Sequence, residues 1–317
     1  MNFYFLDFVL RTPWALRPET MSAYAAVLAE RYGRKTGAPK PVDYAAEGPR
    51  YIQSAAGRSN AATRAGLIAV IPVRGTIVQY ADQLDMCEGG TTTGAISQAL
   101  NSALADETVG SILLHIHSPG GSVYGVQELG DEIRAARAQK PVVAIADSLA
   151  ASAAYWIGSQ AGEFYCTPGG EVGSIGVWQA HQDMSKALEA AGVNVTLISA
   201  GKFKVEGHPY GPLDKDAQRF FQSRTDEYYT AFTDAVARGR KVSVAQVQNG
   251  MGQGRVLGAS AAQAEKMIDG VATLSQVVSG MQRNMRSGGR TALAIGPSSV
   301  FVRSAQANRN ELDLLSL

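Results

Sequence analysis

From residue 66 to residue 199 the chain alternates between short apolar runs and stretches of helical periodicity. "GLIAVIPVRGTIV" at 66–78 is rich in β-branched residues, and "GAISQALNSALAD" at 94–106 has the apolar spacing of a helix. The alternation continues through strands at 110–117, 141–146 and 193–199, short strands at "EFYCT" and "GVWQA", and helices at 124–139, from residue 152 and near 183–191. Such alternation predicts an α/β fold with a largely buried sheet.

The segments on either side of this region differ from it in residue pattern and polarity. Residues 1–64 are predicted to form an N-terminal appendage, with one amphipathic helix over 18–34 and a polar linker after it. The core is expected at 65–275, including a long helix at about 214–239 whose aromatic stripe belongs to the core or to a subunit interface. Residues 276–317 are polar and aperiodic, which predicts a flexible tail.

Composition excludes several classes of protein. The net charge is +1, which offers no polyanion-binding surface and predicts no nucleic-acid partner. Cys87 and Cys166 have no CxxC spacing and are expected to be buried thiols, and the four histidines lack metal-ligand spacing. "MNFYFLDFVLRTPWAL" lacks the basic start and cleavage site of a signal peptide, and no membrane-spanning run occurs. A soluble, cytoplasmic protein without a metal is expected.

Two junctions between a strand and a helix carry candidate chemistry. "HSPGGSV" at 117–123 puts Gly120 and Gly121 where backbone amides can face a ligand, although a plain tight turn would need the same residues. "AASAAYW" at 150–156 puts Ser152 among small residues, where Ala153 could donate a second amide to an oxyanion. Considered alone, a serine at this place is explained as a helix N-cap.

A serine nucleophile needs a base, and no histidine has an obvious carboxylate partner in the sequence. A lysine can serve when burial among apolar groups keeps it neutral. "SAGKFKVEGHPYG" at 199–211 offers Lys202 and Lys204, which point to opposite sides of an extended segment, although either could be a solvated surface lysine. Ser174 in "GGEVGSIGVW" is either a turn residue or a group that orients the lysine.

Taken in order, "SPGG", "ASAAYW", "GSIGV" and "GKFKV" resemble the signal-peptide-peptidase A type of serine protease over about residues 66–275. The resemblance implies a caseinolytic-protease/crotonase-like core of repeated β-β-α units and a Ser-Lys dyad without cofactors. It implies that Ser152 is the nucleophile, Lys204 the base and Ser174 the lysine-orienting residue. Gly120, Gly121 and Ala153 would form the oxyanion hole. Many relatives have Ser-Gly-Gly-Tyr where this chain has Ser152-Ala-Ala-Tyr155, which keeps the amide and the small size.

The run "KFKVEGHPYG" and the N-terminal segment are similar to those of phage capsid-assembly proteases of this type. That narrower resemblance implies polypeptide substrates, such as scaffold or other prohead proteins, and assembly into a homo-oligomer in which neighbouring subunits sometimes share catalytic residues. No fused scaffold is evident after the core. The alternatives are a soluble bacterial peptidase of the same type, a crotonase-fold acyl-CoA enzyme and an inactive structural head protein.

Overall fold

The computed structural model describes residues 12–17, 20, 42–46, 48–53, 66–86 and 89–287. The predicted helix over 18–34 lies outside the described residues except for Thr20, and so does most of the predicted linker. Cys87 is also outside them, whereas Cys166 is an unpaired, buried thiol. Burial raises the pKa of Cys166 to about 12.

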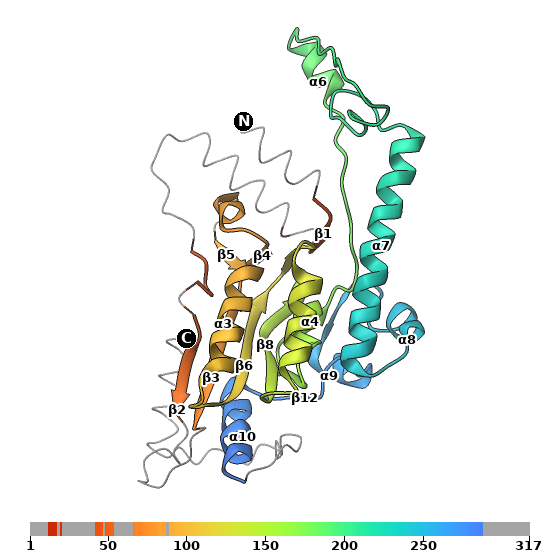
Figure 1. Cartoon of the computed structure of the whole chain (residues 1–317). Coiled ribbons are helices and arrows are strands. Elements are labelled where there is room, and N and C mark those ends of the chain that lie inside the picture. Colours follow the sequence, from red (N-terminus) through yellow and green to blue (C-terminus); the bar gives the residue numbers. More distant parts are fainter. Residues whose placement is uncertain are drawn as a thin grey trace.

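A large, mostly parallel sheet forms the centre of the fold (Figure 1). Its path runs β11-β10-β8-β6-β3-β2, with β9 beside β8 and β12 beside β9. The outer strands β2 and β11 are antiparallel to their neighbours, and the other pairs are parallel. The strands are β2 (Arg50–Gln53), β3 (Leu67–Arg74), β6 (Val109–Ser118), β8 (Val142–Ala151), β9 (Glu163–Cys166), β10 (Glu171–Gly173), β11 (Val256–Gly258) and β12 (Gly270–Val271).

Both faces of this sheet are buried, which explains the continuous apolar runs in the sequence. Along β3, Ala69 and Ile71 join the core on one face, and Ile68 and Val70 join the core on the other. The first face is covered by α3 (Thr93–Ala105), α4 (Val126–Ala136), α5 (Ala153–Gly158) and α7 (Lys215–Arg240). The second face is covered by α10 (Leu274–Arg286).

A second sheet of four short strands lies at one end of the large sheet (Figure 1). Its order is β1-β7-β4-β5, with bounds β1 (Trp14–Leu16), β4 (Thr76–Val78), β5 (Gly90–Thr92) and β7 (Gly120–Ser122). The "PGG" stretch is therefore not only a turn, because its glycines form a strand with neighbours on both edges. The remaining elements are the 3-10 helix η2 (Ala81–Met86), α6 (Ser185–Ala190), α8 (Val244–Asn249) and α9 (Ala259–Ala264).

The prediction of a flexible tail from residue 276 is wrong for its first part, because residues 276–286 belong to α10. Thr273 and Gln276 form a reciprocal capping box at the start of this helix. Val277, Val278 and Met281 recur at helical spacing and are buried against the large sheet. The boundary proposed at 275 therefore cuts through a packed helix, while residues 288–317 lie outside the described part of the chain.

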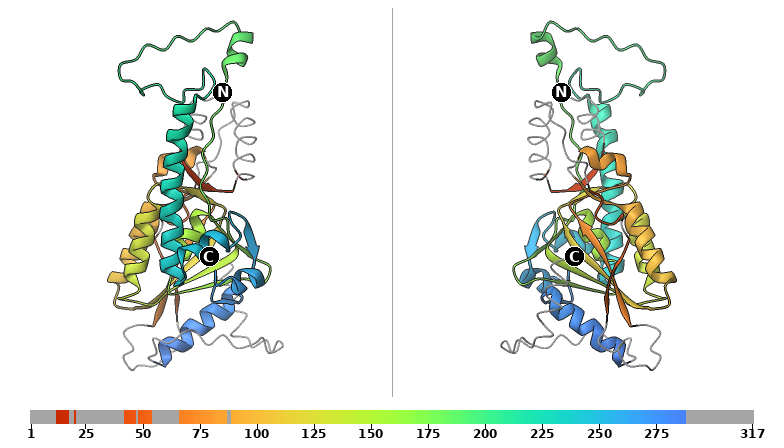
Figure 2. Two further views of the ribbon diagram at one scale, coloured as in Figure 1. Left: turned by 90° about the vertical axis from the view of Figure 1, so that its right-hand side faces the viewer. Right: turned by 90° about the vertical axis from the view of Figure 1, so that its left-hand side faces the viewer.

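The predicted strand at 193–199 is also wrong, because these residues form an extended loop without strand pairing. The loop belongs to residues 180–213, here called the arm, which with α6 extends beyond the N-terminal end of α7 and away from both sheets (Figures 1 and 2). Apolar side chains that looked like a buried strand are instead exposed there: Val193, Val195, Leu197, Ile198 and Phe203. An arm that exposes such residues has unburied apolar surface.

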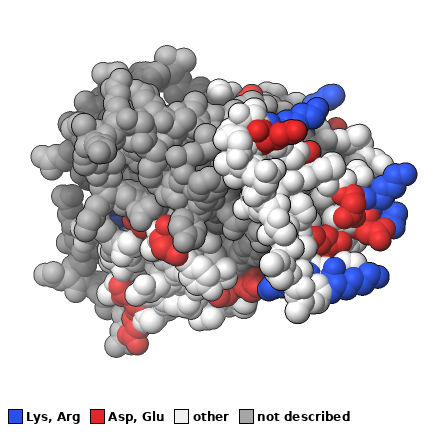
Figure 3. Space-filling model, turned by 90° about the horizontal axis from the view of Figure 1, so that it is seen from above, with Lys and Arg blue, Asp and Glu red and all other residues white. Residues whose placement is uncertain are grey.

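The described surface carries charged side chains of both signs (Figure 3). Acidic and basic side chains lie close to one another on the face seen from above (Figure 3). Within the described ranges, no helix combines the length and the apolar character needed to cross a membrane.

Candidate active site

Ser152 lies between the end of β8 and the start of α5, in a backbone conformation that is rare for any residue with a side chain. Its φ is 56° and its ψ is −117°, and the side chain is 1% exposed. Such a conformation costs about 1–3 kcal/mol and persists only where the surroundings impose it. The Ser152 amide donates to the Gly173 carbonyl at 2.7 Å, which helps to hold the residue in place.

The small residues around Ser152 are all fully buried. Ala151 and Ala153 are 0% exposed, and α5 packs closely against the core behind them. In α5, Trp156 stacks on Phe232 of α7 with ring centroids 4.5 Å apart. A larger neighbour would collide in an interior packed this tightly, so alanines are suited to a sharp turn from strand to helix.

The glycine strand β7 lies directly beside Ser152. A Cβ on Gly120 would lie 2.9 Å from the Ser152 Cβ, and Gly120 has φ +103°. The Gly120 amide donates to the Ser118 hydroxyl at 3.2 Å, so it is not directed at a substrate. Of the two predicted glycine donors, Gly121 is therefore the better placed, and Ala153 offers the first amide of α5.

Ser174 lies on the opposite side of Ser152 from β7. It follows β10, in which Gly173 is opposite Ala151 of β8. Its φ of 55° is again positive, and its amide donates to the Arg255 carbonyl at 2.8 Å. The Ser152 Oγ is 3.5 Å from the Gly176 carbonyl oxygen, which is too long for a strong hydrogen bond. Ser152, Gly120, Gly121, Ala153 and Ser174 are thus brought together.

Lys204 is not brought to this cluster within one chain. It lies in an exposed turn of the arm, and the arm extends beyond the N-terminal end of α7 (Figure 1). The helix after Ser152 packs against Phe232, and at the normal helical rise Phe232 is roughly 25 Å along the axis from the first residue of α7, Lys215. Lys202 is exposed in the same turn, with its Nζ 4.8 Å from the Phe203 ring centroid.

One histidine does have a carboxylate partner that the sequence did not reveal. His115 Nε2 lies 2.9 Å from Asp147 Oδ2, and His117 Nδ1 lies 2.7 Å from the Asp147 carbonyl oxygen. The hydrogen bond from His115 holds the pKa of Asp147 below its ordinary value. These residues lie on β6 and β8, whose pairing was predictable but whose register was not.

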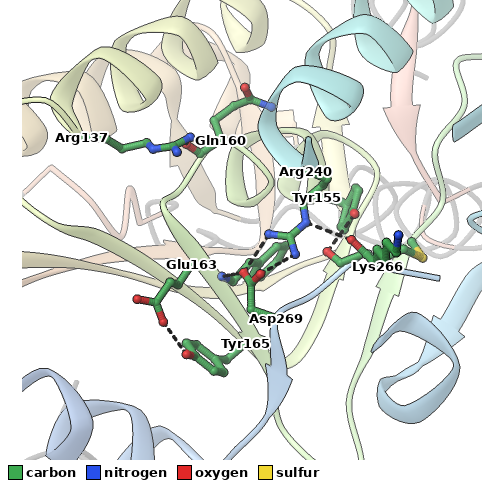
Figure 4. Close-up of polar contacts among 10 residues, drawn as sticks. Arg137, Tyr155, Gln160, Glu163, Tyr165, Arg240, Lys266 and Asp269 are labelled. Carbon is green, nitrogen blue, oxygen red and sulfur yellow. Dashed lines mark hydrogen bonds and ion pairs between the residues drawn. The ribbon is translucent and has the colours of Figure 1, made fainter. Parts of the chain in front are cut away.

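An ion pair that sequence reasoning missed lies near Tyr155 of α5 (Figure 4). Arg240, at the end of α7, makes two bonds of 2.8 and 2.9 Å to the Asp269 carboxylate. Asp269 also accepts from the Phe164 amide at 2.7 Å. Tyr155 donates to the Met267 carbonyl at 3.0 Å, and burial raises the pKa of its phenol. The pair thereby joins α7, β9 and the loop before β12 beneath the helix that follows Ser152.

Asp269→Ala is expected to lower the free energy of unfolding by about 3 kcal/mol, because it leaves the Arg240 guanidinium buried and unpaired. Urea unfolding followed by circular dichroism measures this change. Asp131→Ala is the matched control, since it removes an exposed pair with Arg134 and should change stability by less than about 0.5 kcal/mol. Equal stability losses in both variants would contradict a structural role for the Arg240–Asp269 pair.

Comparison with known proteins bears directly on this site. Residues 134–286, which include Ser152, Ser174 and Lys204, match the model of peptidase family S49. This segment is a member of peptidase family S49. The resemblance inferred from the four motifs is thereby confirmed at the level of the family.

Proteins similar to this chain include two from phages and one from a bacterium. Capsid assembly protease C of Escherichia phage lambda is 38% identical over 177 residues, which are 56% of this chain and 40% of the relative. Head-tail preconnector protein GP5 of Enterobacteria phage P21 is 31% identical over 252 residues, 78% of this chain and 49% of the relative. Protease 4 of Haemophilus influenzae is 28% identical over 212 residues, 67% and 34% respectively.

The chain thus spans less than half the length of each of these three relatives. The family match and the protease names support a serine peptidase.

Proposed function

We propose that the chain is a serine endopeptidase in which Ser152 is the nucleophile and Lys204 the general base. The observation that carries the proposal is the strained, buried Ser152 beside the Gly120–Gly121 strand. A serine held at positive φ next to the backbone amides of a glycine strand and of a helix start is suited to acyl transfer. The core is proposed to be of the caseinolytic-protease/crotonase type, consistent with its parallel sheet and the glycine strand at one end.

In the proposed reaction, the Ser152 hydroxyl attacks the carbonyl carbon of a peptide bond while Lys204 accepts the hydroxyl proton. The amides of Gly121 and Ala153 stabilise the oxyanion, a contribution whose loss typically slows reactions about 10²–10³-fold. Lys204 then protonates the departing amine, and an acyl-enzyme remains on Ser152. Water, deprotonated by Lys204, releases the acid and restores the serine. Ser174 is proposed to orient the lysine amine.

Because Lys204 lies on the exposed arm, we propose that the dyad forms between subunits of a homo-oligomer. The arm exposes Val193, Leu197 and Ile198, which would be buried by contact with a neighbouring copy. Burial would also remove the base from water, a condition that an unprotonated amine requires. Each arm would carry Lys204 to the Ser152 of the next subunit.

The substrates are proposed to be scaffold or other prohead proteins, since two relatives are named as a capsid assembly protease and a head-tail preconnector protein. A soluble peptidase of the signal-peptide-peptidase type remains the second candidate, because Protease 4 of Haemophilus influenzae is also similar. Polypeptide chains are the substrate class in both.

Covalent labelling tests the nucleophile directly. A peptidyl diphenyl phosphonate is expected to add one adduct per chain, located at Ser152 by peptide mass spectrometry, because an activated serine attacks phosphorus. Ser148, which also has a positive φ, should remain unlabelled and is the internal control. Labelling at any residue other than Ser152, or equal labelling of Ser152→Ala, would contradict the assignment.

A further inference from the structure

The short strand β1 pairs with the glycine strand beside Ser152. Its residues run antiparallel to β7, with Ala15 opposite Gly121. On either side of this pair, the Val123 amide donates to the Pro13 carbonyl at 3.2 Å and the Arg17 amide donates to the Pro119 carbonyl at 3.3 Å. Hydrogen-bonded pairs alternate along an antiparallel ladder, so Ala15 and Gly121 form the hydrogen-bonded pair between these two.

The opposite edge of β1 is paired as well. The Trp14 amide donates to the Trp178 carbonyl at 2.9 Å, and the Trp178 amide donates to the Trp14 carbonyl at 3.0 Å. The Trp178 indole also donates to the Leu16 carbonyl at 2.8 Å. The backbone of β1 thus lies between β7 and the segment around Trp178 and is hydrogen-bonded to both. Peptides that bind by strand addition use the same main-chain contacts.

The carbonyl of Ala15 lies next to the nucleophile. A Cβ on Gly120 would be 2.3 Å from the Ala15 oxygen and 2.9 Å from the Ser152 Cβ, so both atoms approach one point. Because hydrogen-bonded residue pairs alternate along the β1–β7 ladder, the Gly121 amide is directed at the same Ala15 oxygen. This amide is the proposed oxyanion donor. Ala15 therefore stands where the residue with the reacting carbonyl of a substrate would stand.

The side chains of β1 fill the groove around it. Trp14 and Leu16 are 1% and 2% exposed, and they pack with Trp178 in a small cluster apart from the main core. Ala15 points to the other side and is fully buried. The groove thus holds one small residue beside the serine, between two large apolar residues.

We propose that β1 is an intramolecular occupant of the substrate groove, so that a polypeptide can reach Ser152 only after β1 has left. The interpretation of this groove as the substrate site rests on the proposed function. The proposal also assigns a preference: an extended segment with a small residue at the reacting carbonyl and large apolar residues on both sides. When β1 fills the groove most of the time, the apparent affinity for an added peptide falls in proportion to the fraction of time that the groove is open.

Peptide binding to inactive protein tests this occupancy without requiring catalysis. A fluorescein-labelled peptide with the sequence of residues 12–17, TPWALR, is titrated with full-length Ser152→Ala and with Ser152→Ala/Leu16→Asp, and anisotropy is recorded. Leu16→Asp puts a charge into the Trp14–Trp178 cluster and should release β1. The double variant is expected to bind the peptide at least about tenfold more tightly than Ser152→Ala.

Two controls accompany the titration. Leu16→Met in the same background conserves volume and should bind as weakly as Ser152→Ala. A peptide with both Trp14 and Leu16 replaced by Asp should bind to none of the proteins. If Leu16→Asp does not fold, as judged by circular dichroism, Trp14→Ser removes the other large side chain of the cluster and takes its place.

Equal peptide affinity in Ser152→Ala and Ser152→Ala/Leu16→Asp, or no binding to either, overturns the proposal. A second measurement separates it from the proposed function: the rate of phosphonate labelling at Ser152 in the otherwise unaltered chain. Leu16→Asp should label at least about tenfold faster than the parent chain. If no protein is labelled while the peptide still binds only the released variant, the nucleophile assignment fails and the occupancy of the groove stands.

Discussion

Ser152→Ala and Lys204→Ala are each expected to reduce peptide hydrolysis by about 10⁴-fold or more. When two residues act as one catalytic unit, replacing either of them removes nearly all of the rate enhancement that the pair supplies. An equimolar mixture of the two variants, unfolded and refolded together, is expected to regain activity. The measurement is cleavage of an unfolded protein substrate or a quenched peptide by each variant and by the mixture.

The mixture regains activity only if each site takes its serine and its lysine from different subunits. Lys204 lies on the exposed arm, whereas Ser152 is buried at the junction between β8 and α5. In randomly assembled oligomers with head-to-tail contacts, a site has an intact serine about half the time and an intact neighbouring lysine about half the time, giving about a quarter of full activity.

Two lysine variants serve as controls. Lys202→Ala removes a lysine from the same exposed turn and should leave activity within about twofold of the parent, since surface substitutions rarely act at a distance. Lys204→Arg keeps the positive charge but cannot act as a base, and should be as inactive as Lys204→Ala. An inactive mixture of fully assembled variants would place both residues in one chain, and an active Lys204→Ala would remove the lysine from the mechanism.

Gly121→Ala is expected to lower the free energy of unfolding by about 3 kcal/mol and to reduce activity about 10²-fold. A Cβ at this position would lie 1.8 Å from the Ile77 carbonyl oxygen and 2.7 Å from the Ile77 Cα. Both are backbone atoms of β4, so no side chain can rotate away. β7 has to move, and its displacement shifts the proposed oxyanion donor relative to Ser152.

Thermal unfolding and peptide hydrolysis measure the two effects. Gly94→Ala is the matched control, because Gly94 lies in α3 and a Cβ there has nothing within 4 Å. That variant should be as stable as the parent or up to about 1 kcal/mol more stable, since alanine favours a helix. Parent-like stability and activity in Gly121→Ala would show that β7 tolerates a side chain and is not held tightly between its neighbours.

Much of the fold was predictable because its signals are local. The apolar runs of β3, β6 and β8 and the periodicity of α3, α4 and α7 can be read from neighbouring residues. The strand predicted at 193–199 was wrong because alternation of apolar residues does not reveal whether a partner strand exists. The tail predicted from 276 was wrong at its start, because the polar residues around Val277 and Val278 masked a one-sided helix.

The candidate site was predictable in part for the same reason. Ser152 and the glycine pair stand out by residue type and by their place at strand ends. Arg240 and Asp269 carry no such signal, since a pair so far apart along the chain is found only when α7 folds back onto the sheet. His115 and Asp147 meet only through the register of β6 and β8.

The sequence by itself determined the α/β alternation, the serine among alanines and the two glycines that admit close strands, because periodicity and residue size act over a few neighbouring residues. Only the tertiary structure decided which distant segments meet Ser152. It placed Ala15 of β1 beside the serine and Lys204 on the arm away from it. The physical reason is that such proximity depends on sheet order, register and the path of a long helix, none of which a local pattern specifies.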